Sequence, residues 1–231
     1  MERGRPIEIV TRDGRKLPVE LFAKFGSKAP GVVMIPPIYG LSDGERAIAW
    51  DYANAGFPVL VPDMFFRTVP GALGRDGADR DKAQARYAAF AVEQGVSDLT
   101  DAVAALRKLP ECNGRAVVFG YCFGGRYAYL AVTRGIVDGG VSFHGTKIGL
   151  DLREAANVRA PLQIHVGDND VSVPMDEVER TKQALAGNPR VSVHVYAGAA
   201  HGFTGKGRPA YHEIADTRSR EGALTLLRSL A

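Results

Sequence analysis

The stretch 116–132 constrains the fold more than any other part of this chain, because an apolar run passes through one sharp turn into a helical run. Residues 116–119 are apolar, as in a buried strand, and residues 127–132 are small or apolar, as in a packed helix. The six residues Gly120-Tyr121-Cys122-Phe123-Gly124-Gly125 lie at the turn. A turn this tight holds its central residue in a strained backbone conformation, so nearby β-carbons would collide with the chain.

The three glycines of this turn fit that requirement. Gly120 and Gly124 remove β-carbons two positions on either side of Cys122, and Gly125 lets the helix approach the sheet. Unpaired N–H groups and the positive end of the helix dipole would then lie behind the sulfur and favour a thiolate. The pattern Gly-x-Cys-x-Gly-Gly corresponds to the nucleophile elbow of α/β-hydrolases with cysteine in place of serine.

Strand patterns alternate with helical patterns along the rest of the chain. Residues 7–11 and 17–23 predict an antiparallel hairpin at a sheet edge, with Pro18 on an edge strand. A glycine-rich irregular loop is predicted at 69–77, and Ser97 is the predicted N-cap of a helix at 98–106. Further strands are predicted at 31–35, 58–63, 140–145, 162–167 and 191–196, and further helices at 42–55, 80–94, 175–186 and 210–230. This order predicts an α/β fold, with a mostly parallel sheet and helices on both faces, in a single domain over residues 1–231.

Composition excludes several classes of protein. The net charge is +3 and no tract is dense in Lys or Arg, so we expect neither nucleic acid nor a membrane surface as partner. No apolar run approaches the ~20 residues of a membrane span, and no signal peptide is recognisable. The two cysteines rule out a disulfide scaffold and show no metal-ligand spacing with the five histidines. We expect a cytoplasmic protein without metal or nicotinamide cofactor, as a monomer or weak homodimer.

A thiol nucleophile needs a base and an orienting acid, and the chain offers both after Cys122. His201 follows the last predicted strand, in a loop of small residues. Asp168 and Asp170 both follow the strand at 162–167, and their spacing does not choose between them. The order Cys, Asp, His is that of α/β-hydrolase triads.

An oxyanion hole needs two N–H donors. One is expected from Phe123, the residue after the nucleophile. The other is expected from the loop after the strand at 31–35, where Pro36 and Pro37 have no N–H and Ile38 offers the first one.

At these positions the chain resembles the dienelactone hydrolase family over nearly its whole length. The matching segments are residues 37–40 (Pro-Ile-Tyr-Gly), 61–63 (Val-Pro-Asp), 95–99 (Gly-Val-Ser-Asp-Leu), 120–125, 167–170 with 173–174, and 198–203 (Gly-Ala-Ala-His-Gly-Phe). The resemblance implies an α/β-hydrolase fold and a triad of Cys122, His201 and Asp170, the last favoured over Asp168 by the family spacing. It also implies an oxyanion hole from Ile38 and Phe123, and hydrolysis of a lactone or small ester through a thioester acyl-enzyme.

Two positions depart from the family members that open dienelactone. Those members carry a glutamate, which helps to activate the thiol, where this chain has Pro37. They also hold the substrate carboxylate with two arginines; Arg80 matches the first, and Gly205 stands at the second, with Arg208 nearby. Tyr39, Tyr87 and His144 are further candidate substrate-binding residues by position. The alternative function is a non-catalytic ligand-binding or thiol-sensing protein on an α/β-hydrolase scaffold.

Overall fold

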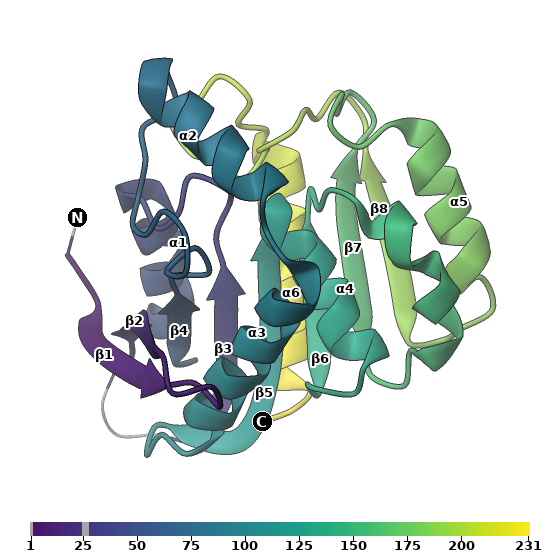
Figure 1. The fold of residues 1–231 in the computed structure, drawn as a ribbon. Helices are drawn as coiled ribbons and strands as arrows, with labels where there is room; N and C mark the ends of the chain where they lie inside the picture. Colours follow the sequence, from purple (N-terminus) through teal and green to yellow (C-terminus); the bar gives the residue numbers. More distant parts are fainter. Residues whose placement is uncertain (1, 25–27) are drawn as a thin grey trace. The chain divides into compact units, whose positions relative to one another are not determined.

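The computed structural model describes residues 2–24 and 28–231, and Figure 1 shows its helices and strands. The chain divides into two units, Met1–Ala116 and Val117–Ala231. Strand β5 (Cys112–Tyr121) carries the chain from the first unit into the second. The single domain expected over residues 1–231 stays a prediction.

The first unit contains four strands before β5, and they lie in the order β1-β2-β4-β3. β1 and β2 form the predicted antiparallel hairpin, β2 is also antiparallel to β4, and β3 runs parallel to β4. The strands are β1 (Arg5–Val10), β2 (Lys16–Phe22), β3 (Ala29–Ile35) and β4 (Val59–Pro62).

The placement of Pro18 on an edge strand is wrong. β2 pairs with β1 on one side and with β4 on the other. The register with β4 begins at Val19, one residue beyond the proline, and the Pro18 carbonyl still accepts the N–H of Asp63 at 2.9 Å. A proline is tolerated here because its missing N–H falls just outside this ladder.

Three helices complete the first unit: α1 (Asp43–Asn54), α2 (Gly77–Ala88) and α3 (Val92–Arg107). α1 packs against β2 and β4, and α3 packs against β1, β3 and β4. Figure 1 shows α2 beyond the carboxyl ends of β3 and β4. Ligands of open α/β sheets bind at this edge, so α2 lies at the edge where a substrate is expected to bind.

The predicted helices at 80–94 and 98–106 have the wrong boundaries. The chain leaves the helix at Ala89 and enters α3 at Val92, so Ser97 lies inside α3 and is not an N-cap. Residues 80–94 contain neither glycine nor proline, so local propensity shows no break. The break brings the ring of Phe90 edge-on to Phe65, with 5.2 Å between centroids, and this contact is tertiary.

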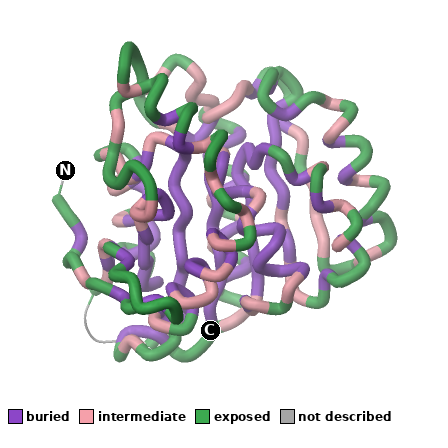
Figure 2. Tube along the Cα trace, viewed as in Figure 1, coloured by how far each residue is buried: buried purple, intermediate pink, exposed green. Residues whose placement is uncertain are grey.

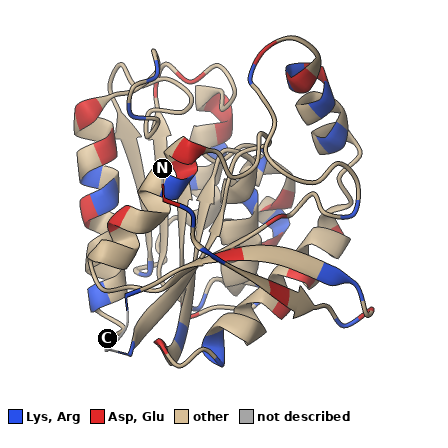
Figure 3. Cartoon of the chain, turned by 90° about the vertical axis from the view of Figure 1, so that its left-hand side faces the viewer, with Lys and Arg blue, Asp and Glu red and all other residues tan. Residues whose placement is uncertain are grey.

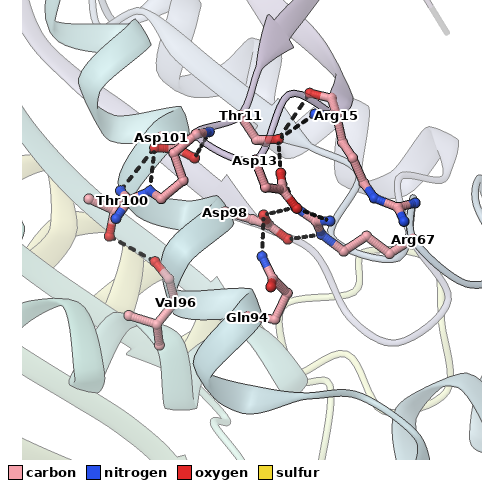
Figure 4. A network of polar contacts seen from close by, with 10 residues as sticks. Thr11, Asp13, Arg15, Arg67, Gln94, Val96, Asp98, Thr100 and Asp101 are labelled. Carbon is pink, nitrogen blue, oxygen red and sulfur yellow. Dashed lines mark hydrogen bonds and ion pairs between the residues drawn. The ribbon is translucent and has the colours of Figure 1, made fainter.

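A polar network ties the β1–β2 turn to α3 (Figure 4). Arg67 donates to Asp13 in the turn at 2.7 Å and to Asp98 of α3 at 2.7 Å. Gln94 donates to Asp98 at 3.1 Å, and Arg12 bonds Asp101 one helical turn further on. The Asp98 side chain is 2% exposed, and a carboxylate so buried needs these donors.

The second unit places β5, β6, β7 and β8 side by side in chain order, all parallel. Neighbouring residues of a strand face opposite sides, and two glycines of β6 identify what covers each side. A β-carbon at Gly139 would lie 3.0 Å from Leu226 of α6, whereas one at Gly140 would lie 2.7 Å from Val132 of α4. α4 and α6 therefore cover opposite faces of this sheet, as predicted.

The remaining elements of the second unit follow the predicted order, with one addition. They are α4 (Phe123–Thr133), β6 (Gly139–Phe143), β7 (Leu162–Gly167), α5 (Met175–Leu185), β8 (Val191–Tyr196) and α6 (Glu213–Arg228). A 3₁₀ segment at Ile148–Asn157, which was not predicted, packs against α4 and α5. Figure 2 shows buried strands beneath helices whose outer faces are exposed.

No helix in the described part of the chain combines the length and the apolar character that a bilayer crossing requires.

Candidate active site

Cys122 lies at the junction of β5 and α4, where it is the N-cap residue of the helix. Its backbone has φ +55° and ψ −113°, a conformation that residues with a β-carbon rarely adopt. Strain of this kind costs about 1–3 kcal/mol and persists only where the surroundings impose it. The Cys122 N–H donates to the Phe143 carbonyl at 3.0 Å, and its carbonyl accepts the N–H of Thr146 at 3.1 Å. The last residue of β6 and the loop after it thus both hold the turn.

Gly120 makes this turn possible, as expected, and Gly125 allows α4 to approach the loop after β6, whereas the role of Gly124 stays a prediction. A β-carbon on Gly120 would lie 2.0 Å from the Gly124 carbonyl oxygen, inside the turn itself. A β-carbon on Gly125 would lie 2.3 Å from the α-carbon of Gly145. The first collision would open the turn, and the second would push α4 away from the loop that follows β6.

The structure brings His201 and Asp170 together. Nδ1 of His201 bonds the Asp170 carboxylate at 2.8 Å, and the other Asp170 oxygen accepts the N–H of Ser172 at 2.8 Å. Asp170 has a fully buried side chain, whereas a quarter of the His201 side chain is exposed. Asp168 does not contact His201 in this way. Its carboxylate accepts the N–H of Gly198 at 2.7 Å and so stabilises a turn.

The loop that carries His201 lies tightly against the end of β7. The Ala199 carbonyl accepts the N–H of Asn169 at 3.1 Å, and Tyr196 accepts the N–H of Asp168 at the same distance. A β-carbon on Gly167 would lie 1.9 Å from the Ala199 oxygen. The small residues of both loops therefore allow the contact that sets His201 beside Asp170.

The electrostatics of this group favour a charged imidazole. Burial lowers the pKa of His201, but its hydrogen bonds to Asp170 and Cys122, and the negative charge of both partners, raise it to about 10. Because Nδ1 of His201 bonds the Asp170 carboxylate, Nε2 is the ring nitrogen that bonds the Cys122 sulfur. A charged imidazole that bonds both a carboxylate and a thiol is the arrangement that a cysteine nucleophile and its base require.

His144 is 2% exposed and lies directly behind His201. Its ring meets that of His201 edge-on, with 4.9 Å between centroids, and its Nε2 lies 3.1 Å from the Thr204 hydroxyl. The backbone of His144 has φ +42°. These contacts support the ring of His201, and contact of His144 with a substrate stays a prediction.

The other candidate residues lie in the first unit. Ile38 is buried in a turn in which Gly40 donates to the Pro37 carbonyl at 2.8 Å. Tyr39 is half-buried beneath Arg75, whose guanidinium carbon lies 4.4 Å from the ring centroid. Arg80 is exposed and Tyr87 half-buried, both on α2. Their roles in binding substrate stay predictions.

Sequence reasoning missed Arg86 on the same helix. Its side chain is buried and donates to main-chain carbonyls of two loops, those of Ile38, Val69 and Gly71. The one available signal was the shortage of large apolar residues on α2, whose buried residues are Ala83 and Arg86. A helix with so little apolar surface needs another means of attachment.

Arg208 takes up the space above Gly205, the position at which the second family arginine was expected. A β-carbon on Gly205 would lie 2.9 Å from Cδ of Arg208, so the arginine stem passes where that side chain would begin. The loop is closed by the Arg208 N–H, which donates to the Gly205 carbonyl at 3.0 Å.

Comparisons with known proteins identify the family of this chain. Residues 18–231 match the model of the dienelactone hydrolase family. A carboxymethylenebutenolidase of Pseudomonas putida is 29% identical over 227 residues, covering 97% of this chain and 96% of that protein.

Solved structures agree on the fold. A crystal structure from Klebsiella pneumoniae subsp. pneumoniae MGH 78578 superposes with a TM-score of 0.85 at 21% identity, covering 97% of both chains. The α/β-hydrolase GrgF from Penicillium sp. sh18 superposes with a TM-score of 0.72 at 14% identity, covering 100% of this chain and 99% of the other. The predicted fold class, an α/β-hydrolase fold with a mostly parallel sheet, is thereby confirmed. On the family match over residues 18–231, this chain belongs to the dienelactone hydrolase family and is a hydrolase.

Proposed function

We propose that this chain hydrolyses a lactone or small carboxylic ester, with Cys122 as nucleophile, His201 as acid and base, and Asp170 as its orienting carboxylate. The observation that carries the proposal is the His201–Asp170 hydrogen bond of 2.8 Å, on a ring that also bonds Cys122 at the strained turn. The three side chains follow the ends of three parallel strands of one sheet, β5, β7 and β8.

The first half of the reaction forms a thioester. The Cys122 thiolate attacks the carbonyl carbon, and the π electrons move to oxygen, where the N–H groups of Phe123 and Ile38 are proposed to stabilise the oxyanion. Collapse of this intermediate expels the alkoxide, which takes a proton from Nε2 of His201. In a lactone the alkoxide remains tethered to the acyl group as a hydroxyl.

The second half regenerates the enzyme. His201, now neutral, removes a proton from a water molecule as that water attacks the thioester carbonyl. Collapse of the second oxyanion releases the carboxylic acid and the thiolate, and the proton stays on His201. The resting pair of thiolate and imidazolium is thereby restored.

We propose that this resting pair explains why the chain can have Pro37 at the position of the family glutamate. The family glutamate at that position helps to activate the thiol, and proline has no carboxylate to offer. Asp170 and Cys122 raise the pKa of His201, and we propose that this imidazole activates the thiol without a further acid or base. We therefore propose a nucleophile that is ionised before substrate arrives.

The substrate is proposed to carry a carboxylate. Relatives such as that of Pseudomonas putida are named carboxymethylenebutenolidase, a name that denotes a butenolide lactone with a carboxymethylene group. Arg80 and Arg208 are the two guanidinium groups proposed to hold that carboxylate, since the Arg208 stem lies over Gly205. Tyr39, Tyr87 and His144 are proposed to line the pocket.

The experiment that tests the nucleophile is hydrolysis of p-nitrophenyl acetate and of a carboxymethylene butenolide by wild type, Cys122→Ala and Cys112→Ala. We expect turnover of both compounds by wild type and by Cys112→Ala, the matched control in which the other cysteine is removed. Cys122→Ala should lose at least about a thousandfold in kcat. Undiminished turnover in Cys122→Ala would remove Cys122 from the mechanism.

One further outcome would favour the alternative function. Reversible oxidation of Cys122 by peroxide, in a wild-type protein that hydrolyses none of these compounds, indicates a thiol sensor and contradicts the proposed hydrolysis.

A further inference from the structure

Arg86 is the largest fully buried side chain in the described part of the chain, and it lies on a helix most of whose residues are exposed. Figure 2 shows α2 largely in the colour of exposed residues. Ala83, one turn earlier, is its other buried residue. Ala83 and Arg86 are thus the two buried residues of a helix of twelve, and burial lowers the pKa of the Arg86 guanidinium.

The Arg86 guanidinium makes four hydrogen bonds to main-chain oxygens. Nε and Nη2 both donate to the carbonyl of Ile38, Nε at 2.8 Å. Nη1 donates to the carbonyls of Val69 at 2.7 Å and Gly71 at 2.9 Å. The underside of the group packs on Phe65, with its central carbon 4.2 Å from the ring centroid. One side chain thus joins α2 to both neighbouring loops.

These bonds determine how the peptide groups on either side of Ile38 are oriented. The Ile38 carbonyl is held by two N–H groups of Arg86, so the peptide between Ile38 and Tyr39 cannot rotate freely. The preceding peptide, which carries the Ile38 N–H, is held through its own carbonyl by the N–H of Gly40 at 2.8 Å. The direction of the Ile38 N–H is set by these two anchors together.

The loop at 69–74 is held by the same group. Besides its bonds to Arg86, Gly71 donates to Asp63 at 2.7 Å, and Leu73 donates to the Tyr39 carbonyl at 2.9 Å. A β-carbon on Gly40 would lie 2.7 Å from the Gly71 oxygen, so the two loops are in direct contact. Without Arg86, three carbonyls would lose their donors at once.

We infer that Arg86 is a positioning residue for the proposed hydrolysis: it aims the Ile38 N–H for the oxyanion and fixes α2, which carries Arg80 and Tyr87. The inference rests on the proposed function, because it supposes an acyl transfer that generates an oxyanion. Arg86 acts through the Ile38 peptide and itself contacts no substrate.

The bond pattern requires the shape of arginine as well as its charge. Two N–H groups converge on one carbonyl while a third nitrogen reaches two others, and a lysine ammonium cannot reproduce that fork. Arg86→Lys should therefore retain the buried cation and lose the alignment, whereas Arg86→Ala opens a space that a small guanidinium compound can enter.

The test compares acyl transfer with a reaction of the same sulfur that forms no oxyanion. We expect kcat for p-nitrophenyl acetate to fall at least about tenfold in Arg86→Lys and Arg86→Ala, since losing an oxyanion donor outright costs about a hundredfold or more. Alkylation of Cys122 by iodoacetamide should stay within about twofold of wild type, because displacement of iodide creates no carbonyl oxyanion. Added methylguanidinium should restore kcat in Arg86→Ala and leave Arg86→Lys unchanged.

The matched control is Arg46→Met, which removes another mostly buried arginine of the first unit. Arg46 is 13% exposed and bonds the Glu20 carboxylate at 2.7 Å, so its loss should lower stability while kcat is kept. Should Arg86→Ala fail to fold, Arg86→Lys carries the test alone. Wild-type kcat in a folded Arg86→Lys, or equal losses in acyl transfer and alkylation, would overturn the inference. A wild-type protein without Cys122-dependent turnover would instead overturn the proposed function, and the inference with it.

Discussion

Single backbone positions around the candidate active site leave no room for a β-carbon. Gly120, Gly125 and Gly167 each face main-chain atoms at 2.3 Å or less once a β-carbon is added. Main-chain atoms cannot rotate away as the end of a side chain can, so these glycines are required by packing. Cys122, between the first two, has to take φ +55° despite its own β-carbon.

Gly167→Ala is expected to destabilise the protein by about 3 kcal/mol or more, because its methyl group would overlap the Ala199 carbonyl. The displaced loop carries His201, so kcat should fall as well. Gly139→Ala is the matched control in the same sheet, since its β-carbon would lie 3.0 Å from the flexible end of Leu226. We expect it to change stability by about 1 kcal/mol or less. Urea unfolding measures both variants, and equal losses would show that the backbone contact is not the cause.

At the scale of elements, the pair β7–β8 buries a histidine whose two ring nitrogens are both hydrogen-bonded. His165 is 1% exposed; its Nε2 faces the Gln163 oxygen at 3.2 Å and its Nδ1 the Tyr196 hydroxyl at 2.8 Å. Its ring stacks on His194 of the neighbouring strand, with 4.8 Å between centroids. Burial, and secondly the charge of His194, lower the pKa of His165 to about 3.

This histidine predicts a loss of stability in mild acid. The unfolded chain protonates His165 below pH ~6.5 while the folded chain does not, so the unfolded state binds more protons and stability falls with falling pH. Between pH 6.5 and 4 this contribution amounts to about 1.4 kcal/mol per pH unit. His165→Gln should flatten that slope when the free energy of unfolding is measured against pH. Parallel curves for wild type and variant would contradict the prediction.

Helix α2, at the same scale, is held by the hydrogen bonds of one buried arginine, where most helices are held by an apolar face. Its sequence contains few large apolar residues, and most of its residues are exposed. Its attachment comes from Arg86, whose partners lie 15 to 48 residues away in the sequence. No periodicity within the helix reports partners at that distance, which is why Arg86 was not among the predicted site residues.

At the scale of the whole molecule, the distribution of charges and the state of the two cysteines are the features to consider. Lys and Arg are interspersed with Asp and Glu over the side shown in Figure 3, in agreement with a net charge of +3. Cys112 and Cys122 are both thiols, the first buried and the second partly accessible. Neither cross-links the chain, so its stability comes from packing and hydrogen bonding.

We predict one fast-reacting thiol in the native protein and two in the unfolded protein, counted with Ellman's reagent. Cys112 is 5% exposed, whereas the Cys122 sulfur lies beside a cationic imidazole that favours attack on the reagent. Cys122→Ser should abolish the fast reaction and Cys112→Ala should keep it. Two fast thiols in the folded wild type would contradict the burial of Cys112. The unfolding midpoint should be the same with and without reductant.

The sequence by itself determined the succession of strands and helices along the chain, the turn at Cys122 and the order of Cys122, aspartate and His201. These depend on local patterns, because a strand that turns directly into a helix requires glycine at particular positions. Only the tertiary structure decided which aspartate bonds His201, where the helix after residue 80 ends, that Arg208 passes over Gly205, and that Arg86 is buried. Each of these depends on atoms brought together by folding, such as the Ala199 carbonyl against Gly167 or Phe90 against Phe65, and such contacts leave no mark on the local sequence.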